Sequence, residues 1–140
     1  TMIGEAALER DKSYEENLKS RIKSLKLEDN FNFVGKINHK NLPAYYQSHD
    51  LFIHLSKTGS LDKAILEAMA CGMKVLSSND ASKSFLSQNL SFDYKNSEEL
   101  ANKIIALKDL EPSSNLREYV IQNHNLDNLI NKISKTINEQ

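Results

Sequence analysis

Residues 56–72, SKTGSLDKAILEAMACG, decide the fold together with LFIHL at 51–55. The apolar run 51–55 is short and bounded by polar residues, which predicts a buried strand. A polar loop containing Gly59 follows, and an Ala-, Leu- and Met-rich helix then ends at Gly72. A strand, loop and helix in this order bring backbone N–H groups and the positive end of a helix dipole to the carboxyl edge of a strand. Open α/β sheets bind anionic ligands at that edge, and Glu67 lies further along the same helix.

The chain on either side of this unit alternates between strand-like and helix-like patterns. An amphipathic helix is predicted at 7–27, with Tyr14, Leu18, Ile22 and Leu25 as its buried stripe. Strands are predicted at 31–35, 73–77 and, as a small edge strand, 90–94. Helices are predicted from 42 to about 49, from Asn96, and around 116–120 and 126–137, with a short one near 81–86. This alternation predicts a Rossmann-like α/β domain, residues 1–140, with a parallel sheet flanked by helices and no internal boundary.

Composition excludes several classes of protein. The 140 residues suffice for one domain with a real core, and 18 basic against 19 acidic residues give no positive field for nucleic acid. The single cysteine, Cys71, cannot form an intramolecular disulfide and is expected to pack, which fits a reducing compartment. No apolar run approaches the roughly 20 residues that span a bilayer. The expected location is the cytoplasm, with the inner membrane surface as an option for the full-length protein.

The string at 66–72, LEAMACG, with a Gly/Ser turn before it and VLSS at 75–78 after it, resembles the signature helix of family 4 (group 1) glycosyltransferases. Residues 3–4, 32–36 and 42–56 are similar to other parts of the same domain. The resemblance implies the C-terminal, nucleotide-sugar-binding half of a GT-B fold. The opening residues 1–4 suggest the tail of a buried strand, so the chain is expected to be a fragment lacking its first βα unit and the N-terminal acceptor-binding domain.

The resemblance also implies roles for individual residues. The Glu67 carboxylate would bind the ribose hydroxyls of a nucleotide-sugar donor, backbone N–H groups after the strand would face the diphosphate and the sugar, and an earlier loop would hold the base. The reaction would transfer a sugar, with retention, to a glycan or lipid-linked acceptor in cell-surface polysaccharide biosynthesis. No cofactor is expected, and no metal, because His39, His49 and His124 have no partner at ligand spacing in the sequence. The implied donor-binding residues are Gly35, Lys36, Ile37, Gly59, Ser60, Leu61, Asp62, Lys63 and Glu67.

The sequence departs from the family pattern in three places. The family usually carries a glutamate at the position of Gly59, so the contact to the donor sugar is in doubt. Its Gly-aromatic-Gly turn is replaced by residues 60–62, SLD, which puts an acid near the expected phosphates. The basic residues that neutralise the diphosphate in the family would lie before Thr1, so this chain alone should bind donor weakly and turn nothing over.

The candidate site residues can also be explained without a ligand. Glu67 could point to solvent, Asp62 could simply favour the helix dipole, and Lys63 could be a solvated lysine. Ser60 is favoured as an N-cap over a ligand hydroxyl, and His54 as a satisfied core or edge histidine over an acid or base.

Two other functions compete with a transferase. The first is a non-catalytic or regulatory domain of the same fold, which the missing glutamate favours. The second, a signalling receiver, is disfavoured because Asp50 precedes its strand and Asp80 lacks acidic company in the sequence.

Overall fold

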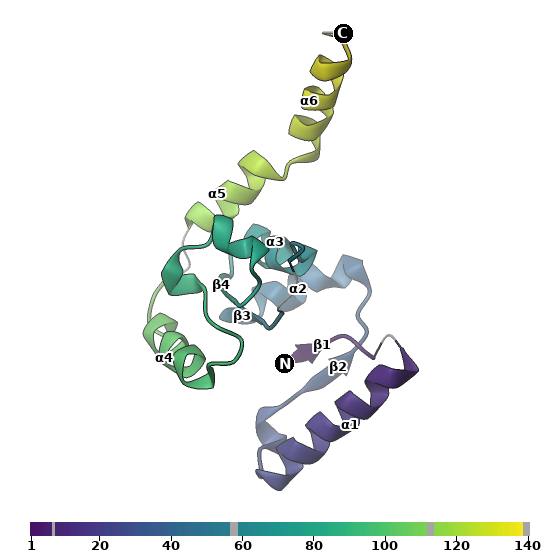
Figure 1. Ribbon diagram of the computed structural model, residues 1–140, viewed down its shortest axis with the longest axis vertical. Helices are drawn as coiled ribbons and strands as arrows, with labels where there is room; N and C mark the ends of the chain where they lie inside the picture. The colour runs from purple at the N-terminus through teal and green to yellow at the C-terminus, as the bar shows by residue number, and fades with distance from the viewer. Residues whose placement is uncertain (7, 57–58, 112–113, 139–140) are drawn as a thin grey trace. The chain divides into compact units, whose positions relative to one another are not determined.

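The computed structural model describes residues 1–6, 8–56, 59–111 and 114–138 (Figure 1). The chain divides into two compact units, residues 1–42 and 43–140. Both units lie within the single domain, residues 1–140, that the sequence predicts. The sequence carries no linker at this point, because the division falls at the start of a helix rather than in a Gly- or Pro-rich segment.

The first unit is a small parallel β-pair with one long helix. It contains β1 (Met2–Ile3), α1 (Glu9–Ser24), the 3-10 turn η1 (Glu28–Asn30), β2 (Phe33–Gly35) and the 3-10 turn η2 (His39–Asn41). Met2 pairs with Phe33 and Ile3 with Gly35. The predicted stripe of α1 is only partly correct: Ile22 is buried, but Tyr14 and Leu25 are 72% and 58% exposed. The expected buried strand at the start is also wrong, since Met2 and Ile3 are exposed.

The second unit has a central parallel pair with helices on both faces. Its elements are α2 (Leu42–Gln47, which begins at the boundary), β3 (Leu51–His54), α3 (Lys63–Ala70), β4 (Lys74–Ser77), the 3-10 turns η3 (Ala81–Ser84) and η4 (Gln88–Leu90), α4 (Ser97–Leu107), α5 (Ser114–Asn123) and α6 (Leu126–Asn138). Strands β3 and β4 pair in register from Leu51 with Lys74 to His54 with Ser77. No helix in the described ranges is long and apolar enough to cross a bilayer.

The two faces of β4 belong to two different layers. Leu76 is fully buried in a cluster with Phe92 and Leu107, against which α4 packs through Leu100 and Ile104. Side chains alternate along a strand, so Val75, which is also fully buried, faces the opposite layer, where α3 packs against β4. Burial on both faces is the ordinary state of a parallel sheet. Because both of its faces are buried, β4 is anchored between the two layers and can hold the neighbouring loops in place.

The end of α3 is as predicted. Cys71 is the C-cap, and Gly72 adopts φ +81°, a conformation that only glycine takes without strain. The Gly72 N–H donates to the Met69 carbonyl at 3.0 Å and the Met73 N–H to the Ala68 carbonyl at 3.1 Å. This pair of bonds is a Schellman motif. It turns the chain directly from α3 into β4.

Other predicted elements are corrected by the structure. The strand at 51–55 is half-buried rather than buried, with Ile53 37% exposed. The short helix near 81–86 is the 3-10 turn η3. The strand at 90–94 is reduced to one parallel bridge between Ser91 and Ser77, because the Asp93 N–H bonds the Glu99 side chain instead of continuing a ladder. The predicted cap of α4 is confirmed: Asn96 accepts from the Glu99 N–H at 2.9 Å.

Candidate functional site

The helix α3 presents Glu67 from an otherwise apolar segment. Ile65, Ala68 and Met69 are fully buried, because they lie on the face that packs against the sheet. Glu67 is half-buried, and its Oε2 accepts a hydrogen bond from the Tyr46 hydroxyl at 3.2 Å. The Glu67 side chain therefore does not simply point to solvent. Its carboxylate is held by a residue of another helix.

Tyr46 is fixed as a hydrogen-bond donor. Its ring lies edge-to-face against Phe52 of β3, with centroids 5.7 Å apart. Burial, followed by the charge of Glu67 and the hydrogen bond to it, raises the pKa of Tyr46 to about 12. Burial and the Glu67 charge also raise the pKa of the Cys71 thiol, which keeps Cys71 as an unreactive thiol. Tyr46 thus orients the Glu67 carboxylate at neutral pH.

The start of α3 differs from the prediction. Asp62, not Ser60, is the N-cap, with φ −81° and ψ 126°, and its side chain makes no capping hydrogen bond to the helix. Its Oδ2 instead lies 3.3 Å from His54 Nε2 and 3.3 Å from Asn79 Nδ2. Two donors from the ends of β3 and β4 hold the carboxylate to one side, away from the N–H groups of the first turn.

His54 is a neutral partner in this cluster. Burial lowers the pKa of His54, while the charge of Asp62 opposes the shift. Its Nδ1 is buried and has no hydrogen-bond partner among the described residues. A proton on Nδ1 would therefore be a buried donor without an acceptor, so the neutral ring carries its proton on Nε2 and donates to Asp62. His54 is an edge histidine as expected, but only one of its two nitrogens is satisfied.

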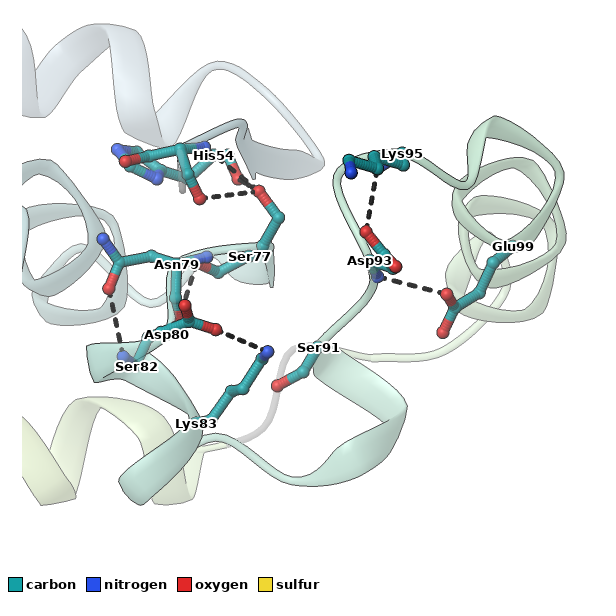
Figure 2. A network of polar contacts seen from close by, with 12 residues as sticks. His54, Ser77, Asn79, Asp80, Ser82, Lys83, Ser91, Asp93, Lys95 and Glu99 are labelled. Atoms are coloured by element: carbon teal, nitrogen blue, oxygen red, sulfur yellow. Dashed lines mark hydrogen bonds and ion pairs between the residues drawn. The ribbon is translucent and has the colours of Figure 1, made fainter. Parts of the chain in front are cut away.

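The residues that follow β4 hold the loop that follows β3. Ser78 Oγ accepts from the Ser56 N–H at 3.0 Å and donates to the Ser56 carbonyl at 3.0 Å. Asn79 is fully buried, and its Nδ2 donates to the Ser60 carbonyl at 2.9 Å. Its Oδ1 accepts from the Ser82 N–H at 3.2 Å, and Ser82 Oγ in turn donates to Ser77 Oγ at 2.9 Å (Figure 2). The loop is thereby tied to the most buried strand.

The predicted base-binding loop belongs to the first unit. Gly35 ends β2 with φ +73°, and its carbonyl accepts from the Gly4 N–H at 2.9 Å. Lys36 is exposed and its Nζ lies 3.7 Å from Glu5 Oε1, and Ile37 is half-buried. Gly35 thus ends β2, and Lys36 and Ile37 belong to the connection between β2 and η2.

The sequence matches one protein family over most of its length. Residues 1–127 match the family described as glycosyl transferases, group 1. The chain belongs to this family. The predicted resemblance is therefore confirmed, and the architecture is that of a domain of these glycosyltransferases.

Relatives and solved structures agree with this assignment. The chain is 37% identical over 65 residues to an uncharacterized glycosyltransferase of Haemophilus influenzae, covering 46% of this chain and 18% of that protein. It is 38% identical over 69 residues to mannosylfructose-phosphate synthase of Agrobacterium fabrum, covering 49% of this chain and 15% of that protein. Anabaena HepE, solved with UDP and with UDP and glucose, superposes with a TM-score of 0.86 at 23% identity, over 99% of this chain and 40% of HepE. The HepE likeness shows a shared fold, and the chain spans less than half of each of these proteins.

In this glycosyltransferase chain, the structure brings together part of the predicted donor site. Ser60, Leu61, Asp62 and Lys63 lead into α3, and Glu67 lies one turn further on; Lys63 and Gly59 are exposed. Sequence reasoning missed four residues that hold this unit; Tyr46, Ser78 and Asn79 are identified by contacts between distant segments, whereas the Ser77 side chain contacts residues that follow it closely. The polar run at 77–79 after a buried strand was the available signal for three of them. These residues are Tyr46, Ser77, Ser78 and Asn79.

Proposed function

We propose that this chain is the nucleotide-sugar-binding domain of a retaining glycosyltransferase, the C-terminal half of a GT-B enzyme whose N-terminal domain binds the acceptor. The observation that carries this proposal is Glu67, held by the Tyr46 hydroxyl at 3.2 Å on the helix that follows β3. A carboxylate oriented by a donor on one oxygen suits recognition of a ribose diol. The membership of the chain in the group 1 glycosyl transferases supports this role.

UDP is the first nucleotide to test. HepE, which has the same fold, was solved with UDP and with UDP and glucose. In the proposed complex, Gly35, Lys36 and Ile37 hold the base through main-chain contacts, and residues 59–63 face the diphosphate and the sugar. The start of α3 suits the diphosphate, because the first turn of a helix presents backbone N–H groups to an anion.

In glycosyl transfer the protein mainly has to stabilise the leaving diphosphate, because negative charge develops on it in the transition state. Backbone N–H groups at the start of α3 and the exposed Lys63 would do this. The proposed acceptor is a glycan or a lipid-linked sugar in cell-surface polysaccharide biosynthesis, and the proposed location is the cytoplasm or the inner face of the membrane. No cofactor is invoked.

The direct test is an amide NMR titration of the ¹⁵N-labelled chain with UDP, GDP and ADP. We expect one nucleotide to shift residues 35–37 and 59–67, and Glu67→Ala to abolish these shifts. Glu118→Ala, which removes an exposed carboxylate from α5, is the matched control and should leave them intact. The proposal is wrong if none of the three nucleotides perturbs these residues at millimolar concentration in a longer protein that extends upstream of Thr1.

A second candidate is a non-catalytic domain of the same fold. The observation that favours it is Gly59, which stands where the family usually has a glutamate and offers no side chain to a donor sugar. The full-length protein separates the two candidates. Binding of a UDP-sugar with neither hydrolysis nor transfer to any acceptor supports the non-catalytic domain, whereas turnover excludes it.

A further inference from the structure

The carboxylate of Asp62 stands at the N-cap of α3 but does not cap the helix. An N-cap aspartate ordinarily accepts a hydrogen bond from an N–H group of the first turn. Asp62 has the extended backbone of an N-cap, with φ −81° and ψ 126°, yet its side chain makes no such bond. An acid therefore stands where the helix could use it, and its carboxylate is held elsewhere.

A second departure from ordinary packing accompanies this placement. His54 Nε2 lies 3.3 Å from Asp62 Oδ2, while His54 Nδ1 is buried and has no hydrogen-bond partner in the part of the chain that the structure describes. A buried polar atom without a partner costs free energy, and such departures from local rules concentrate at functional sites. The missing cap and the unsatisfied nitrogen belong to the same contact. The position of the Asp62 carboxylate is therefore maintained against two local preferences.

Only one oxygen of the Asp62 carboxylate is used to hold it. His54 Nε2 and Asn79 Nδ2 each lie 3.3 Å from Oδ2, and Asn79 is itself fully buried. The other oxygen, Oδ1, accepts no hydrogen bond from the described residues, and the Asp62 side chain is 39% exposed. A carboxylate oxygen has two lone pairs to offer. A side chain that is fixed through one oxygen thus presents the other as a free acceptor.

The charge at this position selects what can bind Oδ1. Both donors to Oδ2 are neutral, so the carboxylate keeps its negative charge. An ionised diphosphate presents acceptors only and is repelled by it, whereas a sugar hydroxyl can donate to it. Among the side chains at 59–63, Gly59 has none, Leu61 is apolar and Lys63 only donates. Asp62 is thus the residue of this loop that can accept from a hydroxyl and cannot bind a phosphate.

We propose that Asp62 binds a hydroxyl group of the donor's sugar through Oδ1, and that it thereby makes the donor site favour the nucleotide-sugar over the bare nucleotide. The inference rests on the proposed function, in which residues 59–63 face the diphosphate and the sugar. Because His54 and Asn79 hold the carboxylate to one side, the first N–H groups of α3 are left to the diphosphate. Asp62 is then a specificity-determining residue, and His54 and Asn79 are positioning residues.

The test compares UDP with UDP-glucose, UDP-galactose and UDP-N-acetylglucosamine, by amide NMR titration of the whole chain and of a longer protein that extends upstream of Thr1. In Asp62→Asn the amide oxygen can still accept from His54 and Asn79, while an N–H₂ group replaces Oδ1. We expect the Kd of at least one UDP-sugar to rise about tenfold relative to that of UDP, because one hydrogen bond to a charged group is lost. The Kd of UDP itself should stay unchanged or fall, because a negative charge near the diphosphate is removed.

Two further variants make this comparison specific. Asp80→Asn is the matched control: Asp80 is also an N-cap aspartate without a capping bond, at the start of η3, and it pairs with Lys83 outside the proposed donor site. It should leave every Kd unchanged. Asp62→Gly removes the whole side chain at an N-cap, where glycine is well tolerated, and it should raise the same ratio of Kd values as Asp62→Asn. Urea unfolding of each variant checks that it is folded.

Two outcomes overturn the inference while leaving the proposed function standing. One is that UDP binds but neither Asp62 variant changes the ratio of the UDP-sugar Kd to the UDP Kd by more than about twofold for any of the three sugars. The other is that both variants raise the Kd of UDP and of the UDP-sugars equally, which would show that Asp62 only shapes the loop. If GDP or ADP binds in place of UDP, the same comparison is made with GDP-mannose or ADP-glucose. If none of the three nucleotides binds the longer protein, the proposed function itself fails.

Discussion

Asn79→Ala removes the side chain that joins the end of β4 to the start of α3. The amide is fully buried and makes hydrogen bonds to the Ser60 carbonyl, the Asp62 carboxylate and the Ser82 N–H. An ordinary hydrogen bond contributes about 1 kcal/mol and one to a charged group about 1.5–3 kcal/mol. The Ser60 and Asp62 hydrogen bonds come from the same N–H₂ group, so their contributions are not fully independent. For the three hydrogen bonds together we expect a loss of roughly 3–4 kcal/mol in the free energy of unfolding. That is a large share of the roughly 5–15 kcal/mol typical of a domain.

The loss is measured by urea unfolding, followed by circular dichroism, of the wild-type chain, Asn79→Ala and the control Asn102→Ala. Asn102 is exposed on α4, and alanine is the better helix former, so the control should be unchanged or slightly more stable. If reordering residues 60–62 costs about 1.4 kcal/mol on binding, Asn79→Ala also raises the UDP Kd about tenfold. An Asn79→Ala midpoint equal to that of the control would refute the claim that this amide holds the loop.

Three further substitutions test other parts of the site. Tyr46→Phe keeps the ring but removes the donor to Glu67, and we expect it to lower the free energy of unfolding by about 1–2 kcal/mol and to weaken UDP binding in the same titration. Gly59→Glu restores the glutamate usual in the family; no atom lies within 4 Å of an added Cβ, so the chain should fold as before and bind UDP-glucose more tightly relative to UDP. Burial holds the pKa of His54 below its ordinary 6.5, so the unfolded chain binds more protons than the folded chain, and the wild type loses stability as the pH falls below 6.5. We expect His54→Gln to reduce this pH dependence, which is measured as the urea unfolding midpoint at several pH values.

Local signals in the sequence are enough to predict most of the second unit. The β3–loop–α3–β4 order follows from one apolar run, one polar loop and Gly72, and the cap of α4 follows from Asn96 and the acid three residues later. These features are fixed by neighbours in sequence, which is why they can be predicted without the fold. The prediction of an edge strand at 90–94 was wrong because the side chain of Glu99, six residues away, accepts the hydrogen bond of the Asp93 N–H.

The candidate site was predictable only in part, for the same reason. Glu67 and the loop at 59–63 were found through their position after a strand and their resemblance to a family. Tyr46 and Asn79 were not found, because their partners lie 21 and 17–19 residues away in the chain. The burial of Tyr14 and Leu25 on α1 was overestimated, since a periodic pattern predicts a stripe but not how much of it a small β-pair can cover.

Asp62 shows how the fold can change the meaning of a residue. In the sequence, an acid at the start of a helix predicts either a favourable interaction with the helix dipole or repulsion of an incoming phosphate. In the structure, its carboxylate makes no capping bond and is held by His54 and Asn79 instead. The N–H groups that an N-cap aspartate ordinarily occupies are therefore not taken by it, and its charge is engaged by two donors to one side. The departure from the family's Gly-aromatic-Gly turn is thus compatible with an anion at the start of α3, provided that His54 and Asn79 keep the carboxylate in place.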